Sequence, residues 1–205
     1  MLKDYTDSLV KAFNTISEEN IDQLYEEIIN RIDGSSLVHV IGNGGSAANS
    51  SHIVGDYNKT FSLLNIKLKF VNNLDNICYL TALANDIDFT EVYSSLVGTH
   101  INSNDLIVFL SGSGNSLNLI KCANKAARFG IKLSSITGYN GGKLKDIVDI
   151  PIHIDYPDME IAEDCQLIIF HYLKQKLVNQ LSKKDPYASA VMTKYSKRVI
   201  EDLIA

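Results

Sequence analysis

Two loops rich in glycine and serine are the first candidates for chemistry in this chain. One is residues 42–46, Gly-Asn-Gly-Gly-Ser, and the other is residues 111–116, Ser-Gly-Ser-Gly-Asn-Ser. Each precedes a helical pattern, and the first amides of a helix have no partner inside it and favour an anion. Serine hydroxyls add further neutral donors, which suit a phosphate monoester. A well-capped strand-to-helix turn is the alternative interpretation of either loop taken alone.

Two other phosphate-binding motifs are relevant to these loops. Residues 42–47 fit the loose dinucleotide pattern GxGxxA. The next apolar run ends at Asn72-Asn73, where an acidic residue for a ribose is expected, although Asp75 is close. The sequence lacks the Gly-Lys-Ser/Thr ending of a P-loop, so hydrolysis of a nucleoside triphosphate is disfavoured. A phosphate site is preferred, and a dinucleotide site remains the alternative.

A histidine and carboxylate pattern follows the first loop. His52 and Asp56 are four residues apart in a helical segment, so both lie on one face, where they can share a divalent metal or form a plain polar pair. A later helical segment carries Glu163 and His171, which are about 12 Å apart along a straight helix. One metal reaches both only if their side chains lean together or one comes from a neighbouring subunit.

Short apolar runs alternate with helical patterns along the chain, and this alternation predicts a parallel α/β sheet buried on both faces. Ligands bind such sheets beyond the carboxyl ends of the strands, where both loops would lie. Strands are expected at 36–41, 68–71, 105–110, 131–137 and 147–154. Helices are expected at 3–32 with a break and an N-cap at Ser17, and at 75–85, 88–101, 116–129, 159–181 and 187–204.

The composition is that of a globular protein, and we expect it to be cytoplasmic. The 205 residues carry a net charge of −5, which argues against nucleic-acid binding through phosphate neutralisation. The sequence contains no apolar segment long enough to cross a membrane and no signal peptide. Its three cysteines, Cys78, Cys122 and Cys165, form no metal pattern and are expected to be buried free thiols. We expect one domain, with N-terminal helices over 1–34, a core over 35–182 and a helical extension over 183–205.

Five segments in this order resemble the sugar isomerase (SIS) domain family, and within it the phosphoheptose isomerases. They are residues 42–56, 82–89, 111–116, 137–144 and 163–171, and the resemblance extends over about residues 5–180. It implies a flavodoxin-like three-layer fold with a five-stranded sheet and a homotetramer with active sites at subunit interfaces. The implied reaction converts sedoheptulose 7-phosphate to a D-glycero-D-manno-heptose 7-phosphate for bacterial heptose biosynthesis.

The resemblance also implies the site residues. Zinc would be held by His52, Asp56, Glu163 and His171, with Asp56 and His171 as the acid–base pair. Substrate contacts would fall on the following residues: Asn43, Gly44, Ser46, Asp86, Ser111, Gly112, Ser113, Ser116, Glu160 and Glu163.

Three positions depart from the family pattern. Asp56 stands for a glutamate, Glu163 for a glutamine and Gly112 for a threonine. A non-catalytic SIS-domain regulator of the replication-initiator-associating type, and an isomerase or lyase for another phosphosugar, are the alternative interpretations. The enzyme is preferred because all four metal positions still hold residues that can bind zinc.

Overall fold

The computed structural model describes residues 1–32, 34–73 and 75–204, with residues 196 and 198–204 described by their backbone alone. Among these residues, five parallel strands form one sheet in the order β2-β1-β3-β4-β5. The strands are β1 Leu37–Gly42, β2 Lys69–Asn72, β3 Leu106–Ser111, β4 Lys132–Thr137 and β5 Ile150–His153. The central strands β1 and β3 pair directly, so the two glycine- and serine-rich loops leave neighbouring strands at the same edge.

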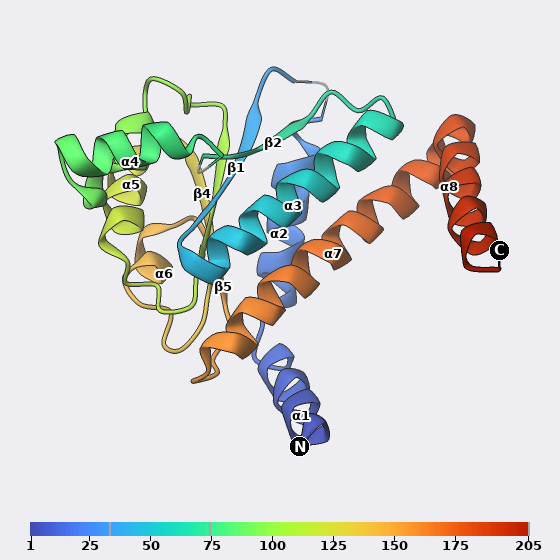
Figure 1. Ribbon diagram of the computed structural model, residues 1–205, viewed down its shortest axis with the longest axis horizontal. Coiled ribbons are helices and arrows are strands. Elements are labelled where there is room, and N and C mark those ends of the chain that lie inside the picture. The colour runs from blue at the N-terminus through green and yellow to red at the C-terminus, as the bar shows by residue number, and fades with distance from the viewer. Residues whose placement is uncertain (33, 74, 205) are drawn as a thin grey trace.

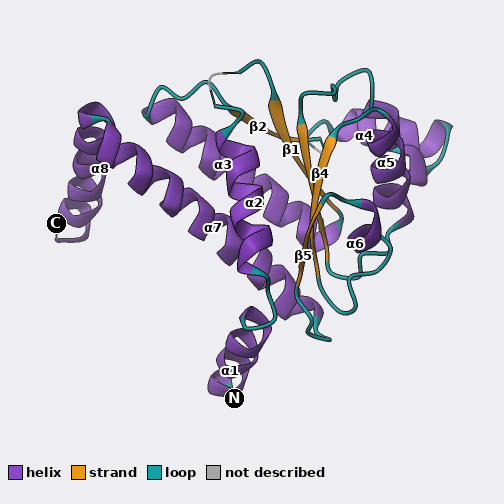
Figure 2. Cartoon of the chain, turned by 180° about the vertical axis from the view of Figure 1, so that it is seen from behind, coloured by secondary structure: helices purple, strands orange, loops and turns teal. Residues whose placement is uncertain are grey.

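The sheet lies between two helical layers (Figure 2). One layer holds α2 Glu18–Ile29, α3 Gly44–Leu63 and α7 Met159–Lys184, and the other holds α4 Ile77–Asp86, α5 Leu117–Arg128 and α6 Leu144–Ile147. Each layer closes its own apolar core against the sheet. Stacked and edge-on rings of Tyr57, Phe61, Phe70 and Phe170 join α3, β2 and α7 in the first core.

Two helices extend from this body (Figure 1). The amino-terminal helix α1, Leu2–Phe13, projects near the start of α7, and α8, Pro186–Ile204, packs near its far end. Local signals set several helix boundaries as expected: Ser17 caps α2 by accepting a hydrogen bond from the Asn20 amide. Gly130 has a φ of +69° just beyond α5, a conformation that glycine adopts without strain.

The helix expected over residues 88–101 is wrong. The chain instead forms two short 3₁₀ helices, η1 Phe89–Glu91 and η2 Ser94–Leu96, followed by a turn in which Gly98 has a φ of +87°. Its apolar residues, Val92 and Leu96 among them, are buried against α5 and its neighbours, so their spacing reflects packing rather than one continuous helix. The fifth strand is also shorter than expected, because residues 144–147 form α6 before it.

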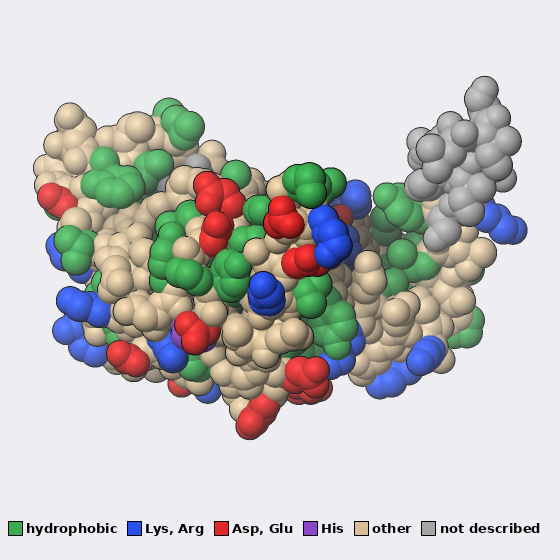
Figure 3. All heavy atoms as spheres, turned by 90° about the horizontal axis from the view of Figure 1, so that it is seen from below, with side chains coloured by type: hydrophobic (Ala, Val, Ile, Leu, Met, Phe, Trp, Pro, Cys, Tyr) green, Lys and Arg blue, Asp and Glu red, His purple; other side chains and the backbone are tan. Residues whose placement is uncertain are grey.

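The expectation of three buried thiols is confirmed for Cys122 and Cys165 and is wrong for Cys78, which is exposed on α4. No helix in the described part of the chain combines the length and the apolar character needed to cross a bilayer. On the face shown in Figure 3, basic side chains are mixed with acidic ones.

Candidate functional site

The loop after β3 is held rigidly at the carboxyl edge of the sheet. The Gly112 carbonyl accepts a hydrogen bond from the Gly138 amide at 2.9 Å, and the Gly114 carbonyl accepts one from the Leu144 amide at 3.1 Å. Gly114 has a φ of +64°, and a Cβ there would lie 2.0 Å from the Gly141 carbonyl oxygen. Only glycine fits at this crossing, so the serine loop and the loop at 138–142 form one unit.

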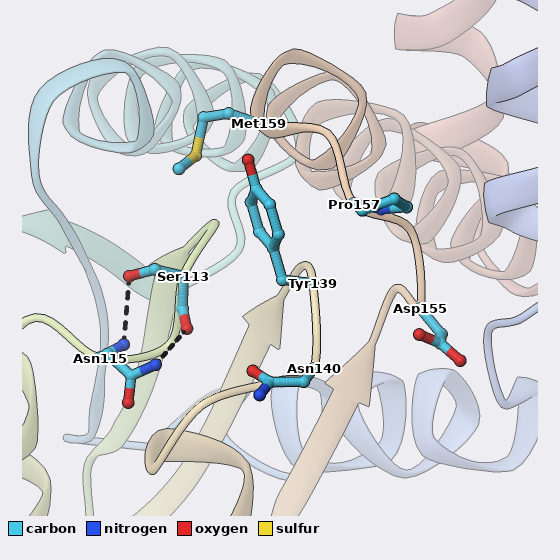
Figure 4. Close-up of a pocket in the computed structure, with 7 residues that line it drawn as sticks. All are labelled: Ser113, Asn115, Tyr139, Asn140, Asp155, Pro157 and Met159. Atoms are coloured by element: carbon cyan, nitrogen blue, oxygen red, sulfur yellow. Dashed lines mark hydrogen bonds between the residues drawn. The ribbon is translucent and has the colours of Figure 1, made fainter.

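A hollow of about 600 Å³ opens beside this unit (Figure 4). Ser113 and Asn115 line one side, and Tyr139, Asp155 and Met159 lie across from them. The Ser113 hydroxyl accepts a hydrogen bond from the Asn115 amide and is only partly buried. The serine loop therefore presents a partly accessible hydroxyl group to this hollow.

The other predicted serines of this loop differ in their surroundings. Ser111 is buried, and its hydroxyl accepts a hydrogen bond from the Gly114 amide. Ser116 is the N-cap residue of α5, but its side chain makes no capping hydrogen bond and is partly exposed. Ser113 and Ser116 thus remain the hydroxyl donors best placed for a ligand, and Ser111 shapes the turn.

The loop after β1 is in contact with polar side chains from α5 and α7. The Glu163 carboxylate lies against Gly45, where a Cβ would come within 2.2 Å of it, and is 3.5 Å from the Ser46 hydroxyl. Asn43 exchanges two amide hydrogen bonds with Asn118 of α5, at 2.9 and 3.0 Å. A carboxylate here interacts favourably with the amino end of α3, so a substrate phosphate is less favoured at this loop than at the serine loop.

Three of the four predicted metal ligands come together between α3 and α7. The Nε2 atoms of His52 and His171 are 3.0 Å apart, although the residues are 119 positions apart in the sequence. With an Asp56 carboxylate oxygen, they offer three ligand atoms that all lie within 4.8 Å of one another. Two imidazoles and a carboxylate are a donor set that zinc accepts, so these residues fit the metal that the family resemblance implies.

The electrostatic surroundings of Asp56 are dominated by two lysines. Burial alone would raise the pKa of the Asp56 carboxyl, but hydrogen bonding and charge from Lys174, with a further contribution from Lys59, hold it below its usual value. Burial lowers the pKa of His171, and the neighbouring His52 and Lys174 lower it further. The site thus favours an ionised Asp56 and a neutral His171, the forms that bind metal.

The remaining predicted residues lie away from this cluster. Glu163 is two turns earlier on α7 and faces the first loop, so the structure does not bring it to His52 and His171. Glu160 is exposed in the first turn of α7. Asp86 is exposed at the end of α4, in the opposite helical layer.

Three residues with clear contacts at the site were missed by the sequence analysis. Lys174 contacts Asp56, Asn118 pairs with Asn43, and the Met159 thioether covers Gly112. Lys174 had a signal, because it follows His171 by three residues and therefore shares its face of α7. Asn118 and Met159 had none, since their contacts cross between elements.

Comparison with known proteins places this chain in a family. A family model described as the SIS domain matches residues 3–138, and the chain therefore belongs to the SIS domain family. A probable phosphoheptose isomerase of Thermoplasma volcanium is 31% identical over 172 residues, which cover 84% of this chain and 88% of the relative. The phosphoheptose isomerase of Helicobacter pylori strain P12 is 27% identical, over 82% and 88% of the two chains. The chain falls in the phosphoheptose isomerase group, which consists of sugar-phosphate isomerases.

Solved structures support the fold. The phosphoheptose isomerase of Neisseria gonorrhoeae superposes with a TM-score of 0.75 at 24% identity, covering 84% of this chain and 94% of the other. That of Francisella tularensis superposes with a TM-score of 0.73 at 23% identity, covering 84% and 93%. The five-stranded sheet with its flanking helices is the architecture of these enzymes.

Proposed function

We propose that this chain converts sedoheptulose 7-phosphate to a D-glycero-D-manno-heptose 7-phosphate. The convergence of His52, Asp56 and His171 carries this proposal, because aldose–ketose isomerisation needs groups that move protons between adjacent carbon and oxygen atoms. The serine loop supports it further, since a phosphate bound at the start of α5 would anchor the substrate far from the reacting carbons.

Asp56 and His171 would divide the proton transfers. The Asp56 carboxylate, which its lysine neighbours keep ionised, would remove the proton from C1 of the ketose and return it to C2. His171, which is held neutral, would carry the hydroxyl proton from the C1 oxygen to the C2 oxygen. Both groups end in their starting protonation states, so the cycle is balanced.

His52, Asp56 and His171 would also hold a zinc ion, one per subunit. When bound, the ion would supply positive charge that stabilises the negative charge developing on the substrate. Glu163 would serve the substrate rather than this ion in a single subunit, because its carboxylate lies at Ser46. Asn43, Ser46, Glu160 and Asp86 would complete the sugar contacts, the last from a site shared between subunits.

We further propose a cytoplasmic homotetramer that supplies heptose for surface glycans. A largely apolar groove of about 610 Å³ between α1, α2 and α7 supports the oligomer. Ile168 and Tyr172, which line it, are 42% and 50% exposed, and exposed apolar surface of this kind suits a contact between subunits. Light scattering after size exclusion would show the mass of four chains.

The first experiment is turnover of sedoheptulose 7-phosphate, followed as aldose formation with added zinc and with a chelator. Turnover that the chelator abolishes would support both the reaction and the metal. Turnover that survives the chelator would retain the isomerase and remove zinc from the proposal. An absence of turnover in both conditions would contradict the isomerase and favour a regulator or another phosphosugar.

A further inference from the structure

The Asp56 carboxylate is in contact with a cation from its own chain. The Lys174 ammonium group forms an ion pair with one carboxylate oxygen, Oδ2, while Lys59 lies 3.3 Å from the other, Oδ1. The two lysines differ in exposure: 19% of the Lys174 side chain is accessible, against 54% for Lys59. An ion pair shielded from water is stronger than an exposed one, so Lys174 is the more tightly held partner.

The Lys174 ammonium group therefore lies on the carboxylate that a metal bound at this cluster would need. Asp56 supplies the single carboxylate of the cluster, because Glu163 faces the first loop. A divalent cation coordinated by His52, Asp56 and His171 would therefore share this carboxylate with a fixed positive charge. Like charges at such close range repel, so the Lys174 ammonium opposes metal binding for as long as it stays on the carboxylate.

The structure offers a place for the displaced side chain. A cavity of about 310 Å³ lies between α3, α7 and α8 and is bordered by both Asp56 and Lys174. Asn179 and Gln175 also line it, and their amide oxygens are acceptors suited to an ammonium group. Lys174 has a flexible four-carbon stem and can turn into this space without moving α7.

We propose that Lys174 is an internal competitor for the metal. Its ammonium group occupies Asp56 in the metal-free chain and withdraws into the neighbouring cavity when zinc binds. The chain consequently binds zinc more weakly than its two histidines and one carboxylate would by themselves. This inference rests on the metal site proposed above and adds a residue that sets its affinity.

Calorimetric titration of zinc into the metal-free, full-length protein tests the competition. Lys174→Met removes the competitor and should tighten zinc binding by about tenfold. Lys59→Met is the matched control, since it also removes one positive charge beside Asp56 but leaves the Oδ2 contact intact. It should change the affinity by much less. Lys174→Arg, which retains the charge, should bind zinc about as the parent does.

A double variant separates competition at Asp56 from other effects. In an Asp56→Asn background the competitor has no carboxylate to hold, so adding Lys174→Met should no longer tighten binding. Equal gains from Lys174→Met and Lys59→Met would overturn the inference, as would no gain or a loss for Lys174→Met in protein whose circular dichroism is unchanged. An absence of zinc binding in every variant would overturn it together with the metal site. Turnover without added metal, measured separately, reports on the isomerase alone.

Discussion

Asp56 and His171 are the residues whose removal should matter most to chemistry. Asp56→Asn keeps the side-chain shape and removes the base, and His171→Ala removes the second proton carrier. We expect each variant to abolish turnover of sedoheptulose 7-phosphate while the far-ultraviolet circular dichroism stays that of the parent. Near-parental turnover of Asp56→Asn would contradict the assignment of the base, and Glu163 would be the next residue to test.

Gly112 and Met159 should behave as a coupled pair. A Cβ at Gly112 would lie 2.0 Å from the Met159 sulfur, and the backbone there has no positive φ that forbids a side chain. Gly112→Ala should therefore cost about 1 kcal/mol of unfolding free energy, because Met159 must move aside. Met159→Ala should remove most of that cost in the double variant. Urea denaturation of the four proteins measures the coupling, and simple addition of the two effects would contradict it.

At the scale of elements, α7 links every part of the site. Its first turn borders the hollow at the serine loop, its second turn places Glu163 at the first loop, and near its middle His171 joins the metal cluster. A change in the structure of the first turn of α7 should therefore affect all three places.

The N-cap of α7 allows this to be measured. The Asp158 side chain accepts a hydrogen bond from the Ile161 amide at 3.0 Å, so Asp158→Ala should cost about 1 kcal/mol of unfolding free energy. Ser17→Ala removes the equivalent cap of α2, a helix that contributes no residue to the cluster, and should cost a similar amount. Only Asp158→Ala should also lower turnover. Equal turnover in the two variants would show that the start of α7 does not control the site.

Much of the fold could be predicted from the sequence because its local signals agree with its global architecture. The expected strands overlap the five observed ones, and Ser17 marks the start of α2 as predicted. The helix predicted over residues 88–101 is wrong because apolar spacing indicates burial, and a buried turn can have the same apolar spacing as a helix.

The site was less accessible to sequence reasoning. Helical spacing placed His52 beside Asp56, but it could not tell which face of α7 meets α3, so His171 joined them only through the family resemblance. The 12 Å estimate made Glu163 a doubtful partner of His171, and in the structure Glu163 indeed lies at Ser46 and outside the cluster of His52, Asp56 and His171. Helical spacing puts Lys174 on the same face of α7 as His171, but its contact with Asp56 also depends on how α7 packs against α3, which the spacing does not contain.

At the scale of the whole molecule, the two layers bury one thiol each. Burial raises the pKa of Cys122 and of Cys165 to about 12, whereas Cys78 is exposed. We expect a disulfide reagent at pH 8 to modify one thiol per native chain rapidly and three after denaturation. Cys78→Ser should eliminate the rapid reaction, and rapid modification of a second thiol would contradict the packing.

These raised pKa values also determine how the stability of the fold depends on pH. Because the pKa of both thiols is higher in the folded state than in the unfolded state, the unfolded chain loses these protons first as the pH rises. The two groups therefore contribute stability below about pH 9 that is lost progressively toward pH 12. Urea denaturation across this range should show a falling unfolding free energy, and Cys165→Ala should reduce the slope.

Side-chain contacts join the first two helices, α1 and α2, to α7 near the other end of the sequence. The Tyr5 hydroxyl donates a hydrogen bond to Asp164, Lys176 pairs with Asp22 at 2.6 Å, and Tyr25 bonds Gln180. During synthesis on the ribosome, α1 and α2 emerge on the order of ten seconds before α7 follows. Until then the contacts of α1 and α2 with α7 are absent, although α2 also packs against β5. The nascent chain therefore exposes part of its amino-terminal apolar surface to chaperones until α7 packs against it.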